Sequence, residues 1–128
     1  MNLLLDTCTF LWIAADASDL SKNARELFLD TENEVYLSAV SAWEISVKHA
    51  LGKLPLPVSP DMFVPRQRER HGITALPLDE IAALQLPKLP TLHRDPFDRM
   101  LICQAIAAGL VILTPDEQIS RYPVRCIW

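Results

Sequence analysis

Hydrophobic residues along this chain of 128 residues occur in short runs separated by polar and proline-containing segments. The leucines at 3–5 are consecutive instead of alternating with polar residues, which is typical of a strand buried on both faces of a parallel sheet. Similar short runs rich in β-forming residues recur along the chain. The strands that this pattern predicts are 2–6, 34–38, 73–76, 110–114 and 124–127.

Segments with apolar residues at helical spacing lie between these strands, and capping residues mark their ends. Asp95 followed by Pro96 is a helix start, and Gly109 is a helix stop. Residues 87–94 form a predicted loop. The predicted helices are 9–15, 23–31, 39–51, 60–71, 80–86 and 97–108. Alternating strands and helices indicate an α/β sandwich with a mostly parallel central sheet, and the length indicates one domain, residues 1–128.

Composition and charge narrow the function classes. The chain is 50% hydrophobic and 22% charged, which excludes intrinsic disorder. Its formal net charge is −4, so a nucleic-acid ligand would need local basic patches or metal ions. The cysteines, at 8, 103 and 126, form neither a zinc motif nor a disulfide framework. Without a signal-peptide pattern or a membrane span of ~20 residues, a cytoplasmic location away from membranes is expected.

Several carboxylates fall where an α/β protein places its ligand. Ligands of open parallel sheets bind at the carboxyl ends of the strands. Some of the acids follow the first and fourth predicted strands, and others lie in the helices beside them. These candidate residues are Asp6, Glu44, Asp95, Asp98 and Asp116.

Each acid also has a purely structural interpretation. Asp6 and Asp116 could cap the segments that follow them, and Asp95 with Asp98 matches a capping box. Glu44 completes a second capping-box pattern with Ser41, and it lies four residues before Lys48, at ion-pair spacing. Taken one at a time, these structural roles are the more common ones for acids at helix starts.

Taken together, the acids favour a metal site. Glu44 lies in a largely apolar segment, and a buried carboxylate is costly unless it is paired or bound to a cation. Four acids at one edge of the sheet would repel one another. Mg²⁺ or Mn²⁺ would remove that repulsion, because both ions prefer oxygen ligands. A carboxylate-held metal suits phosphodiester hydrolysis, since it activates water and stabilises the leaving oxygen.

Four segments of the chain resemble one known family in order and spacing. They are LLLDT at 3–7, SAVSAWEISVKHALGKL at 38–54, HRDPFDRMLICQA at 93–105 and ILTPDEQI at 112–119. The chain is similar to PIN-domain ribonucleases of the VapC-like toxin type, from bacterial type II toxin–antitoxin pairs. The resemblance implies a PIN-like α/β/α sandwich and an endoribonuclease that cleaves single-stranded RNA with Mg²⁺ or Mn²⁺. It also implies a cognate antitoxin protein and a homodimer.

The resemblance also assigns residues. The catalytic and metal-binding acids would be Asp6, Glu44, Asp98 and Asp116. Asp95, Thr114 and Thr7 would support them. Three cations near the acids, which could alternatively form salt bridges, are candidates for holding RNA phosphates: Lys48, Arg94 and Arg99. No histidine is required, because metal ions can replace a general base.

Two other function classes remain as alternatives. A receiver-type phosphoacceptor domain also gathers acids around Mg²⁺, but it needs a lysine after a late strand, and this chain has none beyond Lys88. A noncatalytic binding scaffold would use its acids only as helix caps. Mn²⁺ binding distinguishes the scaffold from the nuclease.

Overall fold

The structure is a computed structural model that describes residues 1–128. Its core is a single sheet in the strand order β3-β2-β1-β4-β5, and every neighbouring pair is parallel. The prediction of a mostly parallel sheet is therefore confirmed, without an antiparallel strand. The strands are β1 (Asn2–Leu5), β2 (Glu34–Ser38), β3 (Thr74–Leu76), β4 (Val111–Leu113) and β5 (Cys126–Ile127).

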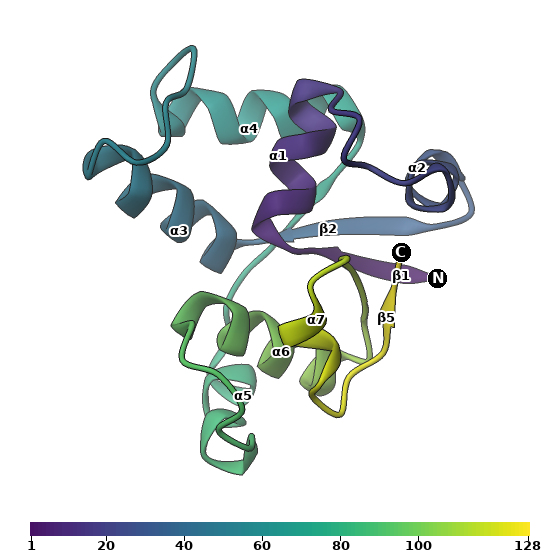
Figure 1. The fold of residues 1–128 in the computed structure, drawn as a ribbon, viewed down its shortest axis with the longest axis vertical. Helices are drawn as coiled ribbons and strands as arrows, with labels where there is room; N and C mark the ends of the chain where they lie inside the picture. The colour runs from purple at the N-terminus through teal and green to yellow at the C-terminus, as the bar shows by residue number, and fades with distance from the viewer.

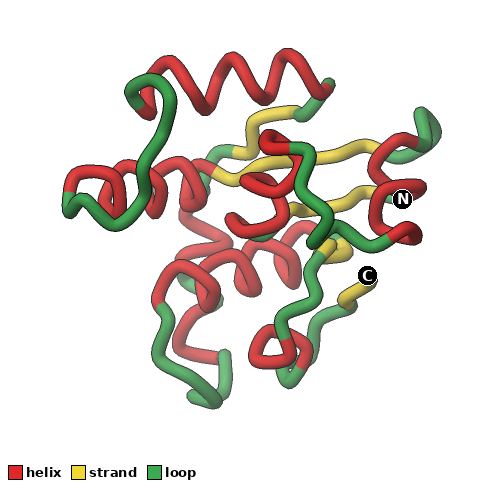
Figure 2. The backbone as a smooth tube through the Cα atoms, turned by 45° about the horizontal axis from the view of Figure 1, so that its top comes forward, coloured by secondary structure: helices red, strands yellow, loops and turns green.

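Helices cover both faces of the sheet. Figure 1 shows α1, α2 and α4 on one side of the strands and α5, α6 and α7 on the other, and the tube in Figure 2 shows the sheet between them. The helices are α1 (Thr7–Ala15), α2 (Lys22–Leu29), α3 (Ala39–Ala50), α4 (Pro60–His71), α5 (Glu80–Ala83), α6 (Pro96–Ala108) and α7 (Glu117–Ser120), with a 3₁₀ turn, η1 (Leu86–Lys88). None of these helices is long and apolar enough to span a bilayer.

The consecutive leucines of β1 fill two separate cores. Leu3 and Leu5 pack with α1 residues such as Phe10 on one face, whereas Leu4 packs with α6 residues such as Leu101 on the other. Successive side chains of a strand point to opposite faces, so a strand covered on both sides needs apolar residues at every position. All three leucines are fully buried, which confirms the prediction made from their pattern.

The strand order places a change of winding direction inside the sheet. The chain moves outward from β1 to β2 and β3 and then returns to place β4 on the other side of β1. β1 and β4 therefore form the point where the winding direction changes. In open α/β sheets, the crevice at the carboxyl ends of two such strands is where ligands bind.

Two local predictions were wrong. The helix expected at 80–86 ends at Ala83, and the 3₁₀ turn η1 follows it and extends into the predicted loop 87–94. Pro87 explains the break, because proline has no amide hydrogen to continue the α-helical ladder. The sequence interpretation also contained no helix at α7, whose four residues are too few to show a hydrophobic period.

Candidate active site

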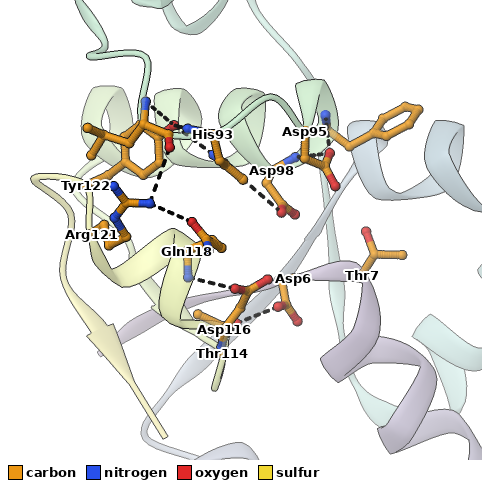
Figure 3. A network of polar contacts seen from close by, with 12 residues as sticks. Asp6, Thr7, His93, Asp95, Asp98, Thr114, Asp116, Gln118, Arg121 and Tyr122 are labelled. Atoms are coloured by element: carbon orange, nitrogen blue, oxygen red, sulfur yellow. Dashed lines mark hydrogen bonds and ion pairs between the residues drawn. The ribbon is translucent and has the colours of Figure 1, made fainter.

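Asp6 lies at the carboxyl end of β1, on the edge where the winding changes. Its carboxylate caps α1 by accepting the backbone N–H of Thr9 at 2.8 Å. The other carboxylate oxygen accepts the hydroxyl of Thr114 at 2.5 Å. The same hydroxyl oxygen accepts the backbone N–H of Asp116 at 3.0 Å. Thr114 thus joins the ends of β1 and β4 and holds two of the predicted acids beside each other, as Figure 3 shows.

Glu44 is a buried carboxylate with a partner at each oxygen. The residue is 4% exposed; the hydroxyl of Thr7 donates to Oε1 at 2.7 Å, and the ammonium of Lys48 forms an ion pair with Oε2. The predicted ion pair is therefore confirmed. The capping-box alternative for Glu44 is wrong, because α3 begins earlier and its cap is Ser38, which accepts the N–H of Val40.

Asp95 and Asp98 take different roles at the start of α6. Oδ1 of Asp95 accepts the backbone N–H groups of Phe97 and Asp98 at 2.9 and 3.1 Å, so Asp95 is the helix cap. The Asp98 side chain turns away from the backbone, and its Oδ2 lies 3.3 Å from Nε2 of His93. Figure 3 shows the Asp98 carboxylate facing the space above Asp6 and Asp116.

The charges of these acids act on one another. Burial raises the pKa of Asp98 to about 8, and the negative charges of Asp95, Asp116, Glu44 and Asp6 add to the effect in that order. Burial also raises the pKa of Asp6, against the hydrogen bonds from Thr114 and Thr9 that lower it. A carboxyl surrounded by other acids resists ionisation unless a cation enters. The four acids predicted from sequence therefore share one electrostatic site.

The predicted phosphate-binding cations differ in their surroundings. Lys48 contacts the cluster directly, and its hydrogen bond to Glu44 raises the pKa of the lysine. Arg94 is exposed just before the start of α6. Arg99 is half-buried, and its guanidinium donates to the carbonyl oxygen of Leu89 at 3.5 Å. RNA binding by these three residues stays a prediction, with Lys48 the best placed.

Two residues at this site were not selected from the sequence. His93 contacts Asp98, although no histidine was expected to be needed, and Tyr122 contacts His93 through its hydroxyl at 2.7 Å. His93 stands five residues before Asp98 in the segment HRDPFD, so its position was a usable signal. Tyr122 gave none, because it lies 29 residues from His93 along the chain.

The carboxylate oxygens of this site are the kind of ligand that Mg²⁺ and Mn²⁺ prefer. No three His, Cys, Asp or Glu side chains surround a common point in this structure. Mg²⁺ does not require such a cage, because it usually binds one or two carboxylates and keeps several waters. The oxygens of Asp6, Asp98 and Asp116 face one space, and their mutual repulsion favours a cation there. These residues fit a hydrated divalent ion.

Comparison with known proteins identifies the family. Residues 3–124 match the PIN domain family. The protein belongs to the PIN-domain family. This PIN-domain protein is 40% identical over 115 residues to Ribonuclease VapC16 of Mycobacterium tuberculosis, a similarity that covers 87% of this chain and 74% of that protein. The predicted resemblance to VapC-like PIN proteins is thereby confirmed, and the receiver alternative is wrong.

Solved structures share the fold of this PIN-domain protein. The structure of VapBC2 from Rickettsia felis bound to a DNA fragment from their promoter contains a chain that matches with a TM-score of 0.75 at 16% identity, covering 99% of this chain and 98% of that one. A chain of FitAcB from Neisseria gonorrhoeae matches with a TM-score of 0.64 at 21% identity, covering 98% and 96%. The similarity extends through both helical layers, because nearly the whole chain superimposes.

Proposed function

We propose that this PIN-domain protein is a metal-dependent endoribonuclease that cleaves single-stranded RNA and acts as the toxin of a toxin–antitoxin pair in the cytoplasm. The observation that carries the proposal is the acid cluster of Asp6, Glu44, Asp98 and Asp116 at the carboxyl ends of β1 and β4. The identity to a protein named as a ribonuclease supports the same reaction class.

The cluster supplies the charge that phosphodiester hydrolysis needs. Asp6, Asp98 and Asp116 would hold Mg²⁺ or Mn²⁺, and Glu44 would add its charge from α3. When bound, such an ion activates a water and neutralises charge on the leaving oxygen. Thr114 and Asp95 contribute by orientation, because the hydroxyl of Thr114 fixes Asp6 and the cap at Asp95 fixes the first turn that carries Asp98.

Lys48 and Thr7 fix the side chain of Glu44, and Lys48 is also a candidate for binding an RNA phosphate. Lys48 is half-exposed, so its ammonium reaches solvent while it pairs with Glu44. An RNA phosphate arriving beside the acids would find this cation and the exposed Arg94. Because the protein carries a net charge of −4, these local cations and the metal are what make binding of a polyanion favourable.

The proposed antitoxin would bind along α1 and cover the acid cluster. A groove of about 320 Å³ runs along this helix, lined by Leu11, Ala14, Leu54, Leu56 and Phe63 among others. The helix that forms one wall, α1, is capped by Asp6, so a partner segment that followed the groove to the start of α1 would reach the acids. We propose a partner with an apolar face for the groove and an arginine for the carboxylates, since a guanidinium can hold a carboxylate through two hydrogen bonds.

Cleavage of a single-stranded RNA by the purified protein tests the proposal. Cleavage should require Mg²⁺ or Mn²⁺ and stop with EDTA. Asp98→Asn should lose most of the activity, because the amide keeps the shape but not the charge. The matched control is Asp19→Asn, an exposed aspartate away from the cluster, which should cut RNA at the wild-type rate. Cleavage that survives complete chelation would contradict the mechanism.

A further inference from the structure

A three-residue chain of contacts leads from the interior of the protein to Asp98. Tyr122 is 3% exposed, and its ring packs edge-on against that of His93, with centroids 5.3 Å apart. The tyrosine hydroxyl contacts Nδ1 of His93 at 2.7 Å, and Nε2 of the same ring faces Oδ2 of Asp98 at 3.3 Å. Figure 3 shows His93 standing between the two other residues.

The hydrogen bonds of the tyrosine decide which nitrogen of His93 carries the hydrogen. The hydroxyl oxygen accepts the backbone N–H of Leu92 at 3.2 Å and that of His93 at 3.0 Å. A hydroxyl has two lone pairs and one hydrogen. With both lone pairs occupied, its hydrogen must go to Nδ1 of His93. The neutral imidazole then carries its own hydrogen on Nε2, where it donates to Asp98.

We infer that Tyr122 and His93 are positioning residues that hold the Asp98 carboxylate for the divalent ion. The Nε2–H group occupies Oδ2 of Asp98 and leaves Oδ1 free for a cation. This inference rests on the proposed function, because it assigns Asp98 to the metal. Hydrogen-bond partners behind a ligand fix its orientation, and their loss typically weakens metal affinity or activity about 10- to 100-fold.

Several hydrogen bonds hold His93 in its position beside Asp98. The loop that carries His93 is fixed by the tyrosine hydroxyl and by Arg121, whose guanidinium donates to the carbonyl of Leu92 at 3.3 Å and to Oε1 of Gln118 at 2.8 Å. Asp98 is fixed from the other side by its place in the first turn of α6. Hydrogen bonds therefore hold the residues at both ends of the His93 contact.

Mn²⁺ titration of purified variants by calorimetry tests the inference. Tyr122→Phe keeps the buried ring and removes the hydroxyl, and His93→Phe removes the donor to Asp98. Each should weaken Mn²⁺ binding about 10- to 100-fold. His93→Gln, whose amide nitrogen can take the place of Nε2, should recover most of the affinity. Tyr36→Phe, at a half-buried tyrosine in β2, is the matched control and should bind as the wild type does.

A double variant separates positioning from general damage. If Tyr122 acts through His93, adding Tyr122→Phe to His93→Phe should change Mn²⁺ affinity by less than about twofold, whereas independent effects would multiply. Thermal melting in EDTA checks that each variant is folded. Wild-type affinity in both single variants, or multiplicative effects in the double variant, would overturn the inference.

Nitrogen NMR of the imidazole tests the same contacts without any metal. Protonated and unprotonated ring nitrogens have well-separated shifts, so at about pH 9, with Asp98 ionised, the wild-type spectrum should show His93 with its hydrogen on Nε2, and Tyr122→Phe should lose this preference. A hydrogen on Nδ1 in the wild type would overturn the inference. If the wild type neither bound Mn²⁺ nor cut RNA, the proposed function would fail, while this spectrum would still decide whether His93 donates to Asp98.

Discussion

Asp98 is a carboxyl on which both burial and the negative charges of neighbouring acids act. Its pKa is raised to about 8, first by burial and then by the acids around it, although its ordinary value is 3.8. A carboxyl in this state exchanges a proton for a metal ion. Protonation and the proposed metal binding at Asp98 would therefore compete, and each would change the stability of the fold.

Stability of the metal-free protein should fall as pH rises from about 4 to about 8, as far as Asp98 contributes. In that window the folded state holds a proton that the unfolded chain has released, so raising the pH favours unfolding. Asp98→Asn should remove this part of the slope, because the amide does not ionise. Urea unfolding in EDTA at several pH values measures it. An equal slope in wild type and variant would contradict the raised pKa.

Mn²⁺ affinity should change with pH in the opposite direction. Because the ion must displace the proton from Asp98, binding should tighten as pH rises toward about 8 and then level off. Calorimetric titration from pH 6 to pH 9, in ~1-unit steps, follows the change. Affinity that stays constant over this range would mean that Asp98 is already ionised in the metal-free protein.

Thr114 shows how one hydroxyl supports two acids. Thr114→Val keeps the side-chain shape but leaves Oδ2 of Asp6 without a donor and the N–H of Asp116 without an acceptor. The expected loss is about 1–3 kcal/mol of unfolding free energy, measured by denaturant titration. Thr74→Val, on the exposed β3, is the control and should stay within about 0.5 kcal/mol of wild type.

At the scale of elements, an aspartate at the start of a helix can both cap the helix and place a negative charge there. Asp6, Asp95 and Asp116 cap α1, α6 and α7, and they also belong to or adjoin the acid cluster. The capping roles weighed from the sequence are therefore confirmed at these positions, and the metal-binding role stays a prediction. A substitution to asparagine removes the charge but keeps the cap, whereas alanine removes both.

Paired substitutions at two of these caps should separate the roles. Asp95→Ala should cost ~0.5–2 kcal/mol with or without Mn²⁺, because α6 loses two hydrogen bonds. Asp116→Asn should leave the metal-free melting temperature unchanged or raised, and should reduce the rise caused by Mn²⁺. Asp79→Ala, which removes the cap of α5, is the control for a pure cap. A full Mn²⁺ shift in Asp116→Asn would make that acid purely structural.

At the scale of the whole molecule, several apolar side chains on and beside α5 are exposed to solvent. Ile81 and Leu84 on and beside α5 are 74% and 64% exposed, and Leu78 lies close to them in sequence. Exposed apolar groups that gather on one face commonly mark a protein interface. We propose these side chains as the contact of the homodimer that the family resemblance predicts.

Ile81→Asp should shift the proposed dimer toward monomer. Placing a charge in an apolar contact leaves it without a partner, while an exposed side chain in the monomer tolerates the change. Light scattering after size exclusion measures the mass, and RNA cleavage at high protein concentration shows whether the site is intact. Leu29→Asp, at an exposed apolar position on α2, is the control. A wild-type protein of monomer mass would contradict the homodimer.

Short-range chemistry made much of the fold predictable. The leucines of β1 indicated a doubly covered strand, and the cap at Asp95 and Gly109, at φ 66°, placed both ends of α6 within a residue or two. These signals act over a few residues, so each one is complete in the sequence. The short α7 and the turn η1 were missed because elements of three or four residues contain no full hydrophobic period.

The acids could be selected from the sequence, but their grouping depended on the return of the chain to β4. Placing β4 beside β1 brings Thr114 against Asp6, 108 residues away along the chain. The contact of Tyr122 with His93, and through it with Asp98, arises in the same way. Residue types and local spacing determined which side chains could do chemistry here. Only the tertiary structure decided which of them meet, because hydrogen bonds and charges act over a few ångströms in space regardless of separation along the chain.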